Sequence, residues 1–361
     1  MSNNVKVLVV GVGRMGTSHA LAYQKMDGFE LAGLMSRNLK NGTEVADAIA
    51  DVPRFEDFDE AMRTVRPDAV SINTYPDTHV EFALKAMDAG CHVFMEKPIA
   101  MTVKDAERVV AKAKDTNRKL VIGYILRVHP SWEKFVEIAR TLGKPLAMRM
   151  NLNQQSSGDA WPWHKTLMES LSPIVDCGVH YVDVMCQMTR ANPVRVHGIG
   201  AHLSDEVEVY NYGHLHVTFD DGSVGWYEAG WGPMMSEVAF FVKDVVGPKG
   251  SVSIEEPKGV RDDTDTLSDS ADINQHTKTS MIRVHHAELD ADNNFTTPDE
   301  LIDMADEPDH QGLCDREQAV FLKAIREDLD LTESMEDAVK SLKIVLAADE
   351  SIRTKRVVEL Q

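Results

Sequence analysis

Cysteine is scarce in this chain, since only four of its 361 residues are cysteines: Cys91, Cys177, Cys186 and Cys314. No two of them form a C-x-x-C pair, and a disulfide scaffold is therefore disfavoured. Long apolar runs are also missing, because no window reaches the roughly 18 residues that span a bilayer. The N-terminus lacks the basic region and apolar core of a signal peptide. We expect a cytoplasmic protein with reduced, buried thiols.

Positive charge is in short supply. The chain has 38 Lys and Arg residues against 58 Asp and Glu residues, a net charge of −20. Such a surface repels phosphate backbones and anionic lipid, so we expect neither a nucleic-acid nor a membrane partner. The charge also promotes solubility. The hydrophobic share of 43% and the charged share of 27% are those of a soluble globular protein, and the length suits about two domains.

The first 123 residues alternate between short apolar runs and amphipathic stretches. Alternation of this kind predicts βαβ units and a doubly wound parallel (Rossmann) sheet. We expect strands over 5–10, 29–35, 68–73, 91–96 and 119–124, and helices over about 17–26, 42–50, 57–65, 77–89 and 102–116.

After residue 123 strand patterns follow one another without helices between them, which predicts an α+β domain over 124–361 with a large open, mainly antiparallel sheet. We expect strands over 193–204, 208–219, 223–231, 236–246 and 250–255, and helices over 130–140, 173–188, 310–328 and 334–354. Residues 256–300 are polar and are expected to form a surface excursion. The last helix, about 334–354, is expected to pack back on the first domain.

A glycine-rich turn, Gly11-Val12-Gly13-Arg14-Met15-Gly16, follows the first predicted strand and opens a helix. In this context G-x-G-x-x-G predicts a dinucleotide site. Gly11 permits the tight turn, Gly13 lets a pyrophosphate approach the backbone, and Gly16 lets helix and strand pack closely. The helix N-terminus, with Arg14 and Met15, offers N–H groups to the phosphates.

The end of the second predicted strand bears on the choice of cofactor. NAD sites usually place a carboxylate there, and this chain has Ser36 and Arg37 instead. A hydroxyl and a guanidinium suit the 2′-phosphate of NADP, which we favour over NAD. The alternative is NAD held through its ribose by Ser36, with Arg37 stacked on the adenine or facing water.

Two further segments carry candidate catalytic residues. Glu96 and Lys97 end a predicted strand before Pro98, at the sheet edge where ligands bind, so Lys97 could stabilise a developing oxyanion. Asp176 and His180 share a helix face, and their pairing suits proton transfer near neutral pH. The alternatives are a solvated Glu-Lys pair and a structural His–Asp pair. No third ligand lies near Asp176 and His180, so no metal is expected.

These segments together resemble the Gfo/Idh/MocA family, which includes glucose–fructose oxidoreductase and inositol dehydrogenase. The resemblance covers nearly the whole chain. Its motifs are G-x-G-x-x-G-x-x-H-A at 11–20, the loop at 73–79, E-K-P at 96–98, Y-x-x-R-x-x-P at 124–130, D-x-G-x-H-x-x-D at 176–183 and a closing helix at 337–354. One departure is Glu169-Ser170-Leu171-Ser172-Pro173, which replaces the family's usual glycine-rich run at the substrate site.

The resemblance implies roles for residues. Lys97 would bind the reacting oxygen and relay its proton, His180 would take the hydroxyl proton on oxidation, and Asp176 would contact substrate. A hydride would pass between the reacting carbon and the nicotinamide. Dimers or tetramers are implied through the open sheet of the second domain. The cofactor would also contact Thr74, Tyr75, Pro76, His79, Glu96 and Lys97.

Family substrates are mostly sugars, cyclitols and related polyols. Trp161 and Trp163 precede the catalytic helix and could offer an indole face to such a ring, or could be core residues. We expect further substrate contacts from Asn153, Gln154, Gln155, His164, Tyr124 and Arg127, the last of which could take one anionic group.

Three functions remain open at this stage. The first is a sugar or cyclitol dehydrogenase or reductase. The second is a glycoside hydrolase that oxidises its substrate transiently and re-reduces it with the same cofactor. The third is a non-catalytic dinucleotide-binding sensor, which the joint presence of Lys97, Asp176 and His180 disfavours.

Overall fold

The computed structural model describes residues 4–37, 39, 48–49, 51–158, 160–235, 242–255 and 279–360. The chain forms two compact units. The first comprises Met1–Val128 and Pro308–Val339, and the second comprises His129–Glu307 and Lys340–Gln361. The first unit thus extends beyond residue 123. It also includes the helix expected over 310–328, which was placed in the second domain on sequence grounds. The helix expected over 42–50 lies almost wholly outside the described residues.

The first unit is built on a six-stranded sheet in the order β3-β2-β1-β4-β5-β6. Every pair of neighbours is parallel, which confirms the predicted doubly wound sheet. Because β1 pairs with both β2 and β4, the strand order reverses beside β1, where ligands bind in such folds. The strands are β1 (Val5–Val10), β2 (Phe29–Met35), β3 (Arg54–Phe55), β4 (Ala69–Ile72), β5 (His92–Glu96) and β6 (Leu120–Gly123).

Helices of the first unit begin at local signals in the sequence. Asp57 and Thr102 cap α2 and α4 by accepting hydrogen bonds from the backbone N–H groups of Glu60 and Asp105. The helix α10 packs on α1, and its Phe321 is fully buried in the core around β1 and β2. The helices are α1 (Arg14–Lys25), α2 (Phe58–Val65), α3 (His79–Asp88), α4 (Val103–Thr116) and α10 (His310–Arg326), with short 3₁₀ helices at Pro76–Thr78 and Ile125–Val128.

The second unit holds a nine-stranded sheet in the order β14-β13-β12-β11-β7-β10-β9-β8-β15. Among the described strands only the β7–β10 pair is parallel, so the sheet is mainly antiparallel as predicted. The strands are β7 (Ala147–Gln155), β8 (Pro193–Ala201), β9 (Tyr212–Phe219), β10 (Val224–Gly232), β11 (Lys243–Gly247), β12 (Gly250–Glu255), β13 (Met281–His286), β14 (Glu300–Asp303) and β15 (Val358–Glu359).

One face of this sheet is packed under helices. On β9, Leu215 and Val217 are buried while the alternate residues His214 and His216 are more exposed, as expected for a half-covered strand. At Gly178 a side chain would meet the Tyr227 ring at 3.1 Å, so glycine lets α8 approach β10 closely. The helices are α5 (Pro130–Ala139), α6 (Ala160–Met168), α7 (Pro173–Asp176), α8 (Gly178–Thr189) and α11 (Thr332–Thr354), whose last part belongs to this unit.

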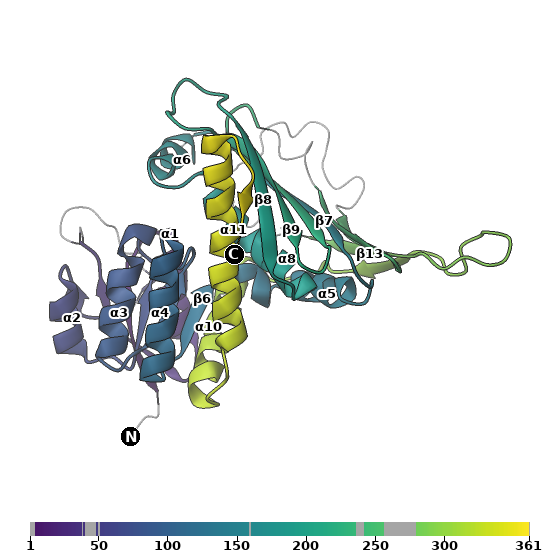
Figure 1. Cartoon of the computed structure of the whole chain (residues 1–361). Helices are drawn as coiled ribbons and strands as arrows, with labels where there is room; N and C mark the ends of the chain where they lie inside the picture. Colours follow the sequence, from purple (N-terminus) through teal and green to yellow (C-terminus); the bar gives the residue numbers. More distant parts are fainter. Residues whose placement is uncertain are drawn as a thin grey trace. The chain divides into compact units, whose positions relative to one another are not determined.

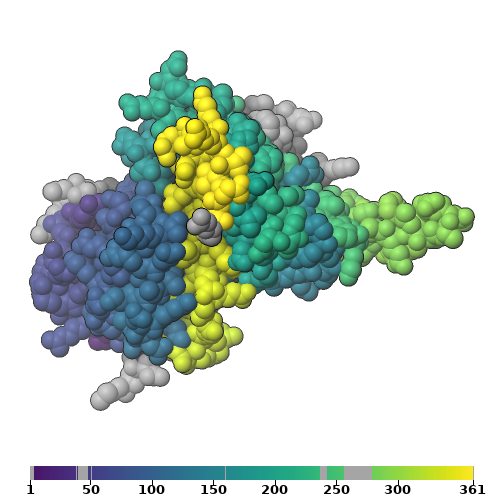
Figure 2. Space-filling model, in the orientation of Figure 1, coloured from purple at the N-terminus to yellow at the C-terminus, as the bar shows by residue number. Residues whose placement is uncertain are grey.

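The expected surface excursion over 256–300 is wrong at residues 281–286 and is confirmed for the exposed segment that follows them. Residues 281–286 form β13, in which Ile282 and Val284 are buried and alternate with polar neighbours. The polar composition around this strand obscured its alternation. The residues between β13 and β14 form an arm that projects from the second unit (Figures 1 and 2) and exposes Leu289 and Phe295. Residues 256–278 and 236–241 lie outside the described part of the chain.

Candidate active site

The glycine-rich turn has the geometry that each of its glycines was expected to serve. Gly11 adopts a φ of +86°, and a side chain there would lie 2.6 Å from the backbone oxygen of Asn73. A side chain on Gly16 would lie 1.8 Å from the Gly11 carbonyl oxygen, so only glycine fits. At Gly13 the same position meets nothing within 4 Å. The backbone at Gly13 is therefore open to a close approach from outside.

The N-terminus of α1 follows this turn and suits an anion. Gly13 is its N-cap residue and offers no side-chain cap, and the first turn contains no acidic residue. Arg14 is exposed there and Met15 is half-buried. Uncapped N–H groups and the positive end of the helix dipole attract phosphate.

The segment after β2 holds the residues expected to choose the cofactor. Ser36 is half-buried, and its backbone N–H donates to the Phe55 carbonyl oxygen at 3.0 Å. Its side-chain hydroxyl takes no part in this backbone pairing. Arg37 is exposed. Both residues lie at the carboxyl end of the parallel sheet, as predicted.

His79 organises the loop after β4. It is fully buried, and its Nδ1 and Nε2 atoms lie 2.9 Å from the carbonyl oxygens of Pro98 and Thr74. Burial lowers the pKa of His79 below its ordinary value. The ring thus joins the loop after β4 to the Lys97-Pro98 segment after β5. Thr74 and Thr78 share a hydrogen bond of 2.6 Å, and Tyr75 is half exposed.

Glu96 is held in the interior at the end of β5. Its Oε1 atom lies 2.9 Å from His19 Nε2, and its Oε2 atom accepts from the backbone N–H of Lys97 at 3.3 Å. A side chain on Gly123 would press on this carboxylate at 3.2 Å. Glu96 therefore acts on the site by holding the Lys97 backbone, and His19 of the first motif is its partner.

The second His19 nitrogen is also engaged, since Gln318 Nε2 lies 2.9 Å from His19 Nδ1. The neighbouring Glu317 is buried, and neither of its carboxylate oxygens has a hydrogen-bond partner among the described residues. Burial raises the pKa of Glu317 well above its ordinary value, and the charge of Glu96 raises it further. Glu317, Cys314 and His19 bring possible ligand atoms within 4.8 Å, but both His19 nitrogens already have partners.

Asp176 and His180 lie where α7 meets α8. The predicted single helix over 173–188 is divided at Cys177, whose φ of −85° and ψ of −36° remain helical. Asp176 and His180 are both half-buried, and Asp176 Oδ2 lies 3.6 Å from the Cys177 sulfur. The backbone therefore stays helical from Asp176 to His180, and the two residues keep their i, i+4 spacing.

Successive residues at the end of β7 point to opposite faces of the sheet. Gln154 faces the helices, where its Oε1 atom accepts from the Trp231 indole at 2.6 Å and from the Cys177 thiol at 3.4 Å. Asn153 lies on the other face and donates to Glu228 at 2.5 Å. Gln155 shares the Asn153 side by the same alternation. Gln154 is thus the residue beside the Asp176 segment, and Trp231 is a neighbour that sequence reasoning missed.

The aromatic residues of α6 divide between interior and surface. Trp161 is buried, whereas the side chain of Trp163 is 48% exposed and can offer its face to a ligand. His164 is buried, with its Nδ1 atom 2.7 Å from Ser156 Oγ and its ring stacked on Trp231 at 4.5 Å. His164 therefore packs against Trp231 in the interior and does not lie at the surface.

Tyr124 and Arg127 belong to the first unit. Tyr124 is buried, and the Arg127 guanidinium lies 5.9 Å from the centre of its ring. Arg127 also forms an ion pair with Asp337 at 3.0 Å. Its charge is therefore already compensated inside the first unit, which weakens the case for an anionic substrate group at this position.

None of the helices built from the described residues combines the length and the apolar character that a membrane span requires.

The parallel sheet and its glycine-rich turn define a dinucleotide-binding fold of the kind found in nicotinamide-dependent oxidoreductases. Comparison with known families agrees. The family model described as "Oxidoreductase family, NAD-binding Rossmann fold" matches residues 5–124, and the model described as "GFO/IDH/MocA C-terminal domain" matches residues 138–253. The chain belongs to the Gfo/Idh/MocA family.

Named relatives include sugar and cyclitol dehydrogenases. UDP-N-acetylglucosamine 3-dehydrogenase of Acidithiobacillus ferrooxidans is 30% identical over 60% of this chain, an alignment that spans 64% of that relative. The NAD(+)-dependent scyllo-inositol 2-dehydrogenase of Bacillus subtilis is 25% identical over 70% of this chain and 75% of its own length.

Solved structures share the fold over the whole chain. The scyllo-inositol dehydrogenase of Lactobacillus casei with bound NAD(H) and scyllo-inositol has a TM-score of 0.72 at 20% identity, covering 99% of both chains. A protein from gentamicin A biosynthesis in complex with NAD has a TM-score of 0.77 at 20% identity, covering 100% of this chain and 97% of the other.

Proposed function

We propose that the chain is an NAD(P)-dependent oxidoreductase that transfers a hydride between nicotinamide and a carbon of a sugar, cyclitol or related polyol. The observation that carries this proposal is the open backbone at Gly13, set between a strand end and an uncapped helix N-terminus. That arrangement suits the pyrophosphate of a dinucleotide. The named relatives act on substrates of the proposed class.

The residues present fit a dinucleotide. Gly11, Gly13 and the first turn of α1 would hold the pyrophosphate, and exposed Tyr75 stands at the end of the neighbouring strand β4. Hydride transfer at nicotinamide C4 is the chemistry that the cofactor supplies when bound. The fit depends on backbone groups, so it does not distinguish NAD from NADP.

The protein's own side chains would handle the proton. The Lys97 ammonium donates to the reacting oxygen and stabilises the negative charge that develops there. His180 accepts the hydroxyl proton on oxidation and returns it on reduction, and Asp176 contacts substrate and supports this transfer. For the surrounding wall we propose Gln154, which lies beside Cys177, and the exposed Trp163.

Substitution of the two proposed catalytic residues tests this assignment. Lys97→Ala and His180→Ala should abolish turnover, while the affinity for NAD(P)H, measured by fluorescence titration, stays within about threefold. Lys104→Ala is the matched control, because Lys104 is an exposed lysine on α4. Near-normal turnover in both variants would refute the catalytic assignment. The substrate itself is sought with a panel of free sugars, cyclitols and glycosides, followed by nicotinamide absorbance and by product analysis.

For the cofactor we propose NADP, because Ser36 and Arg37 stand where NAD sites usually carry a carboxylate. The dissociation constant should be lower for NADPH than for NADH. Arg37→Ala should weaken NADPH binding by about tenfold or more, since a charge-assisted contact is lost, and leave NADH binding unchanged. The reverse order of affinities in the wild type would refute the proposal.

We also propose a homodimer or homotetramer formed through the helix-free face of the nine-stranded sheet. That face exposes three apolar residues on separate strands, Ile199, Val224 and Val246, at 49%, 46% and 45%. The arm between β13 and β14 adds Phe295 at 61% exposure. Val224 and Val246 both pair with Ala147 of β7, so they lie in one exposed apolar row across neighbouring strands, and such rows can mark association surfaces.

A further inference from the structure

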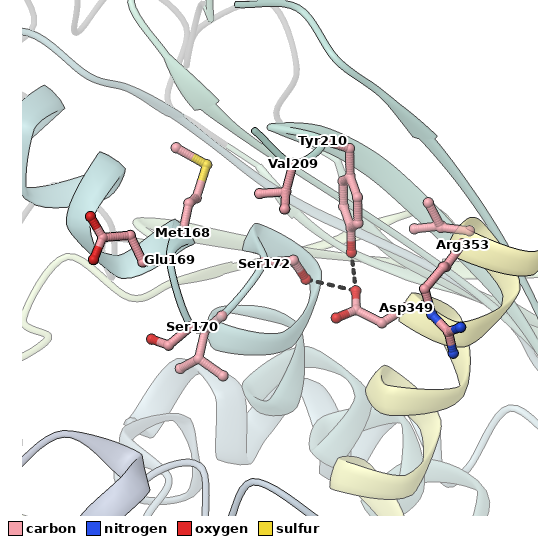
Figure 3. A pocket seen from close by; sticks show the side chains of 10 residues that line it. Met168, Glu169, Ser170, Ser172, Val209, Tyr210, Asp349 and Arg353 are labelled. Atoms are coloured by element: carbon pink, nitrogen blue, oxygen red, sulfur yellow. Dashed lines mark hydrogen bonds between the residues drawn. The ribbon is translucent and has the colours of Figure 1, made fainter. Parts of the chain in front are cut away.

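The second unit contains a pocket beside the candidate acid/base segment. It has a volume of about 360 Å³ and lies between the residues that follow α6, Tyr210 and the last turns of α11 (Figure 3). This volume lies within the range of small-ligand sites. Every residue that lines the pocket belongs to the second unit, and Gln154, Trp163 and His180 are not among them.

The Asp349 carboxylate is the central polar group of this pocket. Its Oδ1 atom accepts from Ser172 Oγ at 2.7 Å and from the Tyr210 hydroxyl. The Ser172 hydroxyl oxygen also accepts from the Val175 N–H, so its own proton is directed at Asp349. Figure 3 shows the second carboxylate oxygen turned away from both hydroxyls, and Asp349 is one of the residues that line the pocket. That oxygen is therefore an oriented acceptor for a ligand's donor.

Arg353 supplies a complementary donor. It lies one helical turn after Asp349 on α11, is exposed at the pocket, and its charge acts on the Asp349 carboxylate. Leu171, Val209 and Ile352 supply apolar surface around the two charged groups. Glu169 adds a second carboxylate at the rim, so the pocket as a whole disfavours an anion.

A carboxylate that accepts, a guanidinium that donates and an apolar wall together match one chemical class. A hydroxyl of a neutral sugar or cyclitol ring donates to the carboxylate, and a neighbouring hydroxyl oxygen accepts from the guanidinium. The C–H face of the same ring can cover the apolar wall. A purely apolar ligand would leave the carboxylate oxygen unpaired, at a cost in affinity.

The pocket is also close in sequence and space to Asp176. Ser172 caps α7 and Asp176 ends it, and the Asp176 N–H donates to the Ser172 carbonyl oxygen at 3.0 Å. One helical turn, about 6 Å, separates the two residues along the axis. Two sugar rings joined by a glycosidic bond can span a distance of this size.

We propose that this pocket binds the second, non-reacting ring of a neutral glycoside or disaccharide substrate. This inference rests on the proposed function, because it assumes that the reacting ring lies at Asp176 and His180. It narrows the substrate class from free monosaccharides to molecules of at least two rings.

Asp349→Asn is the sharpest probe of the pocket. The variant keeps an oxygen to accept from Ser172 and Tyr210, and it replaces the second carboxylate oxygen by an NH₂ group that cannot accept. Glu350→Gln is the matched control, since it removes the same charge from the next residue of α11, which is exposed and does not line the pocket. Arg353→Met is a second probe. Because Arg353 is exposed, this variant should fold even if Asp349→Asn does not.

Calorimetric binding measures the pocket independently of turnover. The probes are maltose, cellobiose, methyl glucoside, glucose and myo-inositol. At least one disaccharide should bind more tightly than the single rings. Asp349→Asn and Arg353→Met should weaken that binding by about tenfold or more, and Glu350→Gln by less than twofold. Equal affinity for single rings and disaccharides, or unchanged binding in both pocket variants, would overturn the proposal.

Kinetics separate this proposal from the proposed function. With the substrate that the absorbance panel identifies, the pocket variants should raise KM for a two-ring substrate with kcat nearly unchanged. Turnover that favours free single rings would overturn the pocket proposal and leave the oxidoreductase intact. Disaccharide binding without any nicotinamide turnover would refute the oxidoreductase and leave the pocket as a carbohydrate-binding site.

Discussion

Gln318 determines which nitrogen of His19 carries the proton. The Gln318 Oε1 atom accepts from the Tyr23 hydroxyl at 2.6 Å, so its Nε2 group must donate to His19 Nδ1, 2.9 Å away. The His19 proton is then on Nε2, which faces Glu96 at 2.9 Å. A residue of α10 thereby orients the carboxylate that holds the Lys97 backbone.

Removing this amide should cost stability. Gln318→Leu removes the acceptor of the buried Tyr23 hydroxyl and the donor to His19 Nδ1, and we expect the free energy of unfolding to fall by about 2–4 kcal/mol. Urea unfolding measures the change. Gln311→Leu is the control on the same helix, because Gln311 is only partly buried, and its loss should stay within about 1 kcal/mol. Equal losses of unfolding free energy in the two variants would show that the buried hydrogen bonds of Gln318 contribute no more than those of the partly buried Gln311.

The glycines of the turn should respond differently to the same substitution. Gly16→Ala forces a carbon to within 1.8 Å of the Gly11 carbonyl oxygen and should destabilise the first unit by several kcal/mol. Gly13→Ala meets no atom within 4 Å, so its unfolding midpoint should match the wild type. It should nonetheless weaken dinucleotide binding by tenfold or more, because the methyl group occupies the pyrophosphate approach. A Gly13→Ala variant that binds NAD(P)H normally would contradict the assigned site.

His92 should make stability depend on pH. Burial and the nearby Arg118 and Lys119 lower the pKa of His92 to about 4, and its Nδ1 atom accepts from the Lys119 N–H at 3.0 Å. In the unfolded chain the pKa is about 6.5. Between pH 6.5 and 4 the unfolded state binds a proton that the folded state does not, so acidification through this window reduces stability.

His92→Asn isolates that contribution. The amide oxygen of asparagine can still accept from the Lys119 N–H, but it does not titrate in this range. Urea unfolding at several pH values between 7 and 4.5 should give a shallower loss for the variant than for the wild type. Identical slopes would mean that other groups account for the acid sensitivity.

The proposed association surface can be tested at one strand. Val224→Asp places a charge on the helix-free face of the sheet and should convert the oligomer to a monomer in light scattering after gel filtration. Val320→Asp is the control, since Val320 is also an exposed valine (39%) but lies on α10 in the first unit. The proposal fails if the wild type is itself a monomer at micromolar concentration, or if Val224→Asp leaves the oligomer unchanged.

The first unit could be predicted in detail because its signals are local. A β-branched run followed by G-x-G-x-x-G predicted β1, the turn and α1, and the caps Asp57 and Thr102 mark helix starts within a few residues. Strand β3 was missed, because two residues, Arg54 and Phe55, are too short for a periodic pattern. The hydrogen bond between Glu96 and His19 was not predicted, since the two residues are distant in the sequence.

The second unit was harder to predict because its pairings are remote. The parallel β7–β10 pair joins residues 77 positions apart, and β13 is hidden in a polar stretch. Asn153, Gln154 and Gln155 were named together at the end of β7, although only Gln154 of the three faces Cys177. A strand's composition predicts that its faces differ, and only its neighbours decide which face meets the helices.

The sequence by itself determined the parallel sheet, the anion-binding turn and the family, because each depends on short runs of residues whose spacing acts locally. Tertiary structure alone decided the partners of His19, the division of α10 and α11 between the units, and the pocket around Asp349. Those features depend on residues such as Ser172, Tyr210 and Asp349, which meet only when distant segments pack together.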